Sequence, residues 1–142
     1  MCVLISPRPN RVDGRPEVEK AERDMRIEMN ERDGVTVVKP EGERLDLEVS
    51  VEFRAMLLRA IAAGQRQLVV DLADIEFIDS SGLGALVSAL KALRAQHNGD
   101  IRLAGLQQPV VELLKVTRLN RVFSSYPTAE EAVQSFGHEG VA

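Results

Sequence analysis

The feature that most constrains this chain is a change in apolar spacing that repeats along its length. Short apolar runs typical of β-strands alternate with longer segments in which apolar residues recur every three or four positions, as on one face of a helix. Strands separated by helices need crossover connections, and right-handed crossovers place such strands parallel in one sheet. The sequence therefore predicts an α/β domain.

The regular pattern opens with a predicted β-hairpin. Apolar and polar residues alternate over residues 25–29, Asp33-Gly34 offers a two-residue turn, and an apolar run follows at residues 35–38. The two strands of a hairpin pair antiparallel, so this unit adds an antiparallel edge to the parallel strands. We therefore expect a mixed sheet.

Helix and strand signals then alternate to the end of the chain. Gly64 and Gly99 are suited to the left-handed ends of two helices, and Thr128 with Glu131 forms a capping box before the last one. Further strands are expected at residues 68–72, 101–103 and 122–126, and helices at residues 47–63, 80–97, 109–116 and 128–136. The predicted fold class is α/β, with a mixed sheet (leading hairpin, then parallel strands) packed with about four helices in the order ββαβαβαβα.

The chain has 142 residues, which suits one domain of ordinary size. Residues 1–24 differ from the rest, because prolines and a glycine interrupt them and five basic residues balance five acidic ones without apolar periodicity. That composition is typical of a flexible leader. Cys2 is the sole cysteine, which rules out a disulfide within the chain, and no run approaches the roughly 18 apolar residues of a membrane span. We expect a cytoplasmic protein without membrane insertion.

The charge and aromatic content bear on the class of partner. The net charge is −4, from 18 Lys and Arg against 22 Asp and Glu, and no basic block of the kind that coats phosphate backbones is present. Aromatic residues make up 4% of the chain and Trp is absent, so platforms for stacking bases are scarce. A protein or a small ligand is a better expectation than nucleic acid.

The residues of familiar enzyme sites do not come together in this sequence. A Ser nucleophile needs a base within hydrogen-bond reach, and His97 closes the helix that Ser80 opens, about 25 Å away at 1.5 Å per residue. Gly82-Leu83-Gly84 lacks the third glycine of a dinucleotide loop, since Val87 occupies that position. One Cys and two scattered His give no metal-ligand spacing. We therefore expect no catalytic residue, metal or cofactor, and no enzyme.

The polar junction Asp79-Ser80-Ser81-Gly82-Leu83-Gly84 is the candidate functional site. Ser and Asp at a helix start are explained by capping of free backbone N–H groups. Asp79, Ser80 and Ser81 are more candidate caps than one helix needs. Each of the two glycines lowers helix stability by roughly 0.5 to 1 kcal/mol relative to Ala. The other explanation is a docking and modification site. A phosphate on Ser80 would add about −1.5 to −2 charge beside Glu76 and Asp79, and would repel a partner that fits the unmodified surface.

Residues 71–84 resemble the signature of the STAS domain, in its bacterial anti-sigma factor antagonist branch. Residues 43–46 and 52–54 are similar to the family's earlier acidic element and first helix, and residues 113–119 and 129–133 to its third and terminal helices. Glu43 stands where the family usually has Gly, which suggests a different turn or a one-residue shift at Gly42, and Val49 replaces a commonly polar residue. The resemblance predicts a STAS domain at residues 25–137, between the leader (1–24) and a tail (138–142).

The resemblance implies a cytoplasmic regulator that binds a kinase-type anti-sigma factor and thereby frees a sigma factor. That serine kinase would use its own ATP to phosphorylate Ser80, which follows the signature Asp, and a serine phosphatase would reset the switch. The implied partner-binding residues are Asp46, Asp79, Ser80, Ser81, Gly82, Leu83 and Gly84. The alternative is a non-switching STAS subunit of a lipid-transport or stress-signalling assembly, in which Ser80 is only a helix cap.

Overall fold

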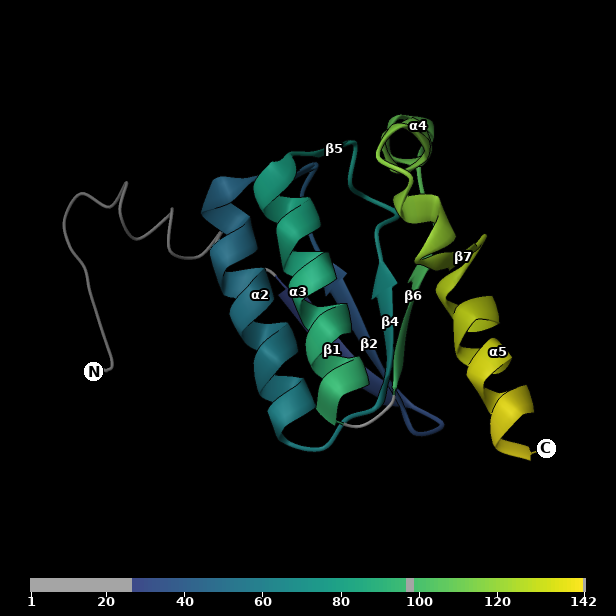
Figure 1. Cartoon of the computed structure of the whole chain (residues 1–142). Helices are drawn as coiled ribbons and strands as arrows, with labels where there is room; N and C mark the ends of the chain where they lie inside the picture. Colours follow the sequence, from purple (N-terminus) through teal and green to yellow (C-terminus); the bar gives the residue numbers. More distant parts are fainter. Residues whose placement is uncertain (1–26, 97–98, 142) are drawn as a thin grey trace, which may run out of the picture.

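The computed structural model describes residues 27–96 and 99–141 (Figure 1). The predicted leader, the first residues of the hairpin and the predicted helix end at His97-Asn98 lie outside the described residues. The boundaries proposed for the leader therefore stay predictions.

A five-stranded mixed sheet forms the centre of the domain (Figure 1). Its strands, in sheet order, are β1 (Ile27–Arg32), β2 (Val35–Pro40), β4 (Gln67–Asp71), β6 (Asp100–Ala104) and β7 (Ser124–Tyr126). β1 pairs antiparallel with β2 and the other pairs are parallel, which confirms the predicted hairpin and mixed sheet. Asp33 and Gly34 both take positive φ, at 54° and 80°, as a tight hairpin turn between right-twisted strands requires.

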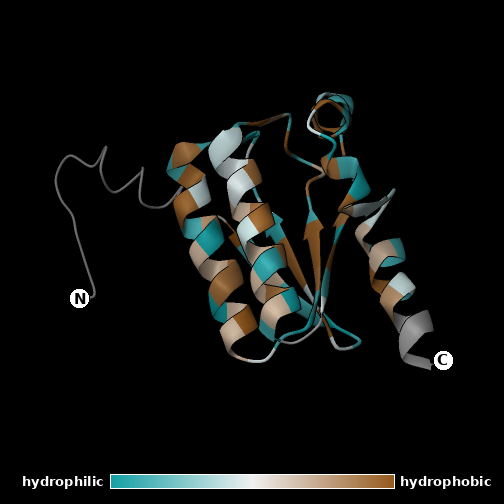
Figure 2. Ribbon diagram, in the orientation of Figure 1, coloured by the Kyte–Doolittle hydropathy of each residue, from teal (hydrophilic) through white to brown (hydrophobic). Residues whose placement is uncertain are grey.

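Helices cover both faces of this sheet. α2 (Leu47–Ala62) and α3 (Ser80–Gln96) lie side by side on one face, α5 (Ala129–Val141) covers the other, and α4 (Gln108–Val116) lies at one end (Figure 1). Successive residues of β4 serve both layers, since Leu68 and Val70 pack under α2 and α3 whereas Val69 packs under α5. Figure 2 shows the hydrophobic colour of β4 between the layers. The apolar run at residues 68–72 is thus a central strand, as predicted.

Most element boundaries agree with the predictions to within one or two residues, and the last strand and the last helix show differences. The last strand begins at Ser124 instead of Val122, because residues 119–121 form a short 3-10 helix, η1 (Leu119–Arg121). The last helix continues beyond Phe136 to Val141. The predicted cap of this helix is present, since the Glu131 amide donates to Thr128 Oγ1 at 3.1 Å.

A second, very small sheet was not predicted. β3 (Arg44–Leu45) and β5 (Phe77–Ile78) pair in parallel, outside the main sheet. Gly42, at φ 103°, turns the chain into β3, so the left-handed conformation is supplied one residue before Glu43. This pair bears on the candidate site because β3 leads directly into α2 and β5 leads directly into α3.

Candidate functional site

The β3–β5 pair brings the N-termini of α2 and α3 together. Its register sets Leu45 beside Ile78, and each helix begins two residues further on. Asp46 and Asp79, the residues that precede the two helices, therefore lie at the same edge of the domain. The Asp79 amide donates to the Leu45 carbonyl at 3.4 Å, which ties the start of α3 to the start of α2.

Asp79 is the cap of α3. Its Oδ1 accepts hydrogen bonds from the amides of Ser81 and Gly82, at 2.9 and 3.1 Å, and from the Ser81 hydroxyl at 2.5 Å. The hydrogen bonds from the Ser81 hydroxyl and the Gly82 amide are the main causes that lower the pKa of the Asp79 carboxyl below its usual 3.8. The Ser81 and Leu47 amides lower this pKa further by smaller amounts, and burial opposes the shift in part. The Asp79 carboxylate thus accepts three hydrogen bonds from the first turn of α3.

We predict that Asp79 contributes to the acid sensitivity of the fold. Because the folded-state pKa is lowered below 3.8, this contribution is present above that pH and is lost as the pH falls through the folded-state value. Asp79→Asn, which keeps a capping oxygen but no titrating group, should flatten the decline in stability below pH 4. Urea unfolding midpoints measured from pH 5 to pH 2 would check this.

Ser81→Ala is the companion variant for this measurement, because it removes the first cause of the lowered Asp79 pKa. Ser81→Ala should also make the stability of the fold decline less steeply below pH 4, but by a smaller amount than Asp79→Asn does. If the urea unfolding midpoints of Asp79→Asn and wild type fall equally between pH 5 and pH 2, Asp79 does not contribute to the acid sensitivity of the fold.

The two neighbouring serines differ in availability. The Ser81 hydroxyl is half-buried and donates to Asp79. Ser80 is exposed in the first turn of α3, and within the described part of the chain its hydroxyl has no hydrogen-bond partner. Of the three candidate caps, Asp79 performs the capping, Ser81 supports it, and Ser80 presents a free hydroxyl to solvent.

The remaining residues of the predicted site have different surroundings. Gly82 is buried, and a Cβ there would lie 2.5 Å from the Leu45 carbonyl oxygen. Gly84 is exposed with open space around it, whereas Leu83 is half-buried and packs on the core. Asp46 makes no side-chain cap bond to α2, and its Oδ2 lies 3.3 Å from Arg44 Nε. Packing therefore explains one of the two glycines.

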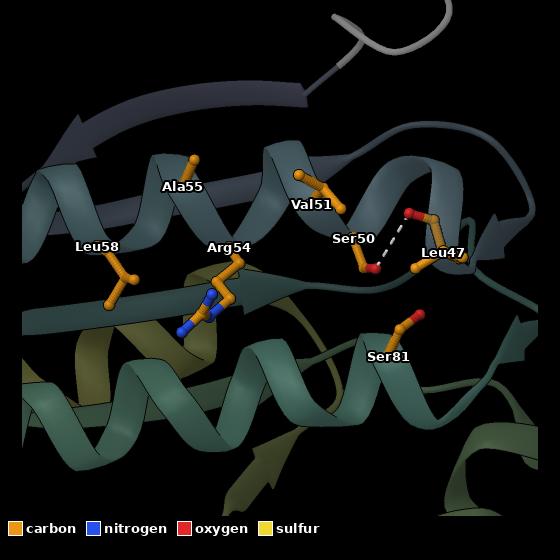
Figure 3. Close-up of a pocket in the computed structure, with 7 residues that line it drawn as sticks. All are labelled: Leu47, Ser50, Val51, Arg54, Ala55, Leu58 and Ser81. Carbon is orange, nitrogen blue, oxygen red and sulfur yellow. Dashed lines mark hydrogen bonds between the residues drawn. The ribbon is translucent and has the colours of Figure 1, made fainter.

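A groove beside Ser81 was missed in the sequence. It has a volume of about 380 Å³ and is lined by Leu47, Ser50, Val51, Arg54, Ala55, Leu58 and Ser81 (Figure 3). Leu47 and Val51 are 66% and 67% exposed. The signal was present, because these two apolar residues lie out of phase with the buried residues Phe53, Leu57 and Ile61 of the same helix.

Neither a metal site nor a membrane-spanning helix is found in the described residues. Within 27–96 and 99–141, no three His, Cys, Asp or Glu side chains gather in a way that could hold a metal ion. Over the same ranges, no helix has the length and apolar content needed to cross a membrane. The chemistry at this edge is that of an exposed hydroxyl, carboxylates and apolar side chains.

A mixed sheet with two neighbouring helices that start side by side, one of them capped by an Asp with an exposed Ser next to it, defines an α/β domain of the STAS type. The family model described as "STAS domain" matches residues 26–132, and the chain belongs to this family. The chain is 31% identical to the anti-sigma F factor antagonist of Paenibacillus polymyxa over 110 residues, which is 77% of this chain and 92% of that protein.

Solved structures agree on the fold. A Thermotoga maritima protein described as an anti-sigma factor antagonist superposes with a TM-score of 0.72 at 25% identity, over 80% of this chain and 97% of that one. The Bacillus cell fate determinant SpoIIAA, solved in its phosphorylated form, gives a TM-score of 0.63 at 21% identity over 78% of this chain and 98% of its own. The resemblance found in residues 71–84 is thus confirmed at the level of the family.

Proposed function

We propose that this protein is an anti-sigma factor antagonist that works as a phosphorylation switch in the cytoplasm. In its unmodified form it binds a kinase-type anti-sigma factor and frees a sigma factor. The kinase uses ATP to phosphorylate Ser80, the complex is lost, and a serine phosphatase restores the active form. The protein itself performs no catalysis in this cycle.

The observation that carries the proposal is the division of labour between the two serines. A kinase needs a hydroxyl that it can reach without unfolding its substrate, and Ser80 is exposed and without a hydrogen-bond partner in the described residues. The Ser81 hydroxyl is already engaged with Asp79. The P. polymyxa relative is named an antagonist of an anti-sigma factor, which supports the same role for this chain.

The electrostatics of the helix start support a loss of binding on phosphorylation. The amides of Ser81 and Gly82 already donate to Asp79. A phosphate on Ser80 would find these two amides already engaged, and its charge of about −1.5 to −2 would add to that of Asp79 at an exposed position. A partner complementary to the unmodified surface is repelled, while the fold is kept.

Incubation with a purified anti-sigma factor kinase from the same genome and ATP tests the proposal, with intact mass as the readout. We expect one phosphate on the wild-type chain, none on Ser80→Ala, and one on Ser81→Ala, the matched control from the adjacent position. No added phosphate, or phosphate on Ser81 alone, would refute the switch. The first of these results would favour the non-switching STAS subunit.

A further inference from the structure

The groove beside the site leaves apolar surface of α2 uncovered. Leu47 and Val51, one turn apart, are each about two-thirds exposed, at 66% and 67%, at the end of the helix nearest Ser81 (Figure 3). Figure 2 shows hydrophobic colour over these first turns of α2. Contiguous apolar surface next to a polar edge is typical of a contact site.

The described chain starts at the same edge of the domain. Ile27, the first residue of β1, pairs with Pro40 at the end of β2, and the chain reaches α2 seven residues later, at Leu47. Twenty-six residues precede Ile27 in the sequence. The 22 residues from Ile5 to Ile27 can span at most about 75 Å, whereas the whole of α2 is about 24 Å long. The segment before β1 is therefore long enough to reach the groove.

The sequence of that segment complements the groove. Residues 1–5 are Met-Cys-Val-Leu-Ile, the longest unbroken apolar run before β1. Residues 17–24 hold four acidic residues and two basic ones. In the groove, Arg54 points toward α3 (Figure 3), and within the described residues it has no ion-pair partner. An apolar run and a net acidic stretch on one tether match an apolar surface that carries the Arg54 cation.

We propose that residues 1–5 bind in the α2 groove of the same chain, against Leu47 and Val51. The tether raises the local concentration of the segment to the millimolar range, so even a weak contact is populated without any other molecule. Bound there, the segment covers surface beside Ser81 that a partner approaching Ser80 would need. This consequence for partner binding rests on the proposed function, whereas the contact itself does not.

Disulfide trapping tests the contact, because Cys2 is the sole cysteine and lies within the proposed segment. Val51→Cys places a second thiol in the groove, and Val116→Cys places one on α4, where Val116 is 78% exposed. Under mild oxidation of dilute protein, we expect the intramolecular disulfide from Cys2 to form at least tenfold faster in the Val51→Cys variant than in the Val116→Cys variant. Peptide mapping by mass spectrometry identifies each bond.

Ala55→Cys, in the same groove, provides a second trapping position should Val51→Cys perturb the helix. Leu4→Asp should slow trapping at both groove positions, since it puts a charge in the apolar run. Equal rates at the groove and at α4, or disulfides only between two chains, would overturn the proposal. No kinase is used in the trapping experiment, so a negative result there would not bear on the phosphorylation of Ser80. Likewise, a failure to phosphorylate Ser80 would not bear on the contact between residues 1–5 and the groove.

Discussion

Replacing Ser80 with Asp is expected to abolish binding to the anti-sigma factor and to leave the fold intact. The exposed Ser80 side chain has no hydrogen-bond partner in the described part of the chain, so its loss costs no packing. The first turn of α3 contains no acidic residue, and a carboxylate there gains about 0.3 to 1 kcal/mol from the helix dipole, offset in part by repulsion from Asp79. The melting temperature should therefore stay within about 2 °C of wild type.

The expected loss of affinity for Ser80→Asp is at least about 100-fold. A charge of the wrong sign at an interface costs several kcal/mol, and about 3 kcal/mol corresponds to a factor of roughly 100 in Kd. Titration calorimetry with the purified anti-sigma factor measures this directly. Ser80→Ala should bind like wild type, and so should Ser124→Asp, a matched control at an exposed serine on β7. Wild-type affinity for Ser80→Asp would contradict the switch.

Most of the fold could be predicted because the apolar periods were clear. The run at residues 68–72 is buried on both faces of the sheet, and the face of α2 that holds Phe53 and Leu57 recurs at helical spacing. The pair formed by β3 and β5 could not be predicted, since two residues per strand carry no period. That short pair is nevertheless what sets the two helix starts side by side.

The candidate site was located from the sequence, but the roles within it were not. Asp79, Ser80 and Ser81 are all good capping residues, and only the structure shows that Asp79 accepts the amide bonds. The exposure of Leu47 and Val51 depends on how α2 rotates against the sheet.

The start of α2 shows why its rotation was hard to predict. Val49 lies four residues before Phe53, a spacing that predicts a position on the buried face, but the structure has Val49 half-buried and the small polar Ser50 buried. A polar side chain in a buried position breaks the apolar pattern on which such a prediction depends. The exposed apolar residues of the groove were therefore not recognised as a surface.

The largest expected effect on stability comes from Gly82→Ala. An added Cβ would lie 2.5 Å from the Leu45 carbonyl oxygen and 2.8 Å from Ile78 Cγ2, and both atoms belong to the β3–β5 pair. Backbone cannot move aside as a flexible side chain can, so α3 and β3 must separate. Overpacking of this kind costs about 2 to 3 kcal/mol, which for a domain of this size lowers the melting temperature by roughly 10 °C.

Gly84→Ala is the matched control, two residues along the same helix. A Cβ at Gly84 meets no atom within 4 Å, and Ala is favoured over Gly inside a helix by about 0.5 to 1 kcal/mol, so this variant should melt a few degrees above wild type. Thermal unfolding followed by circular dichroism compares the two. Because Leu45 also accepts the Asp79 amide, Gly82→Ala should in addition disturb the alignment of the helix starts and weaken anti-sigma factor binding. Equal melting temperatures for the two variants would show that α3 does not need its close approach to β3, and that the glycine at position 82 has another purpose.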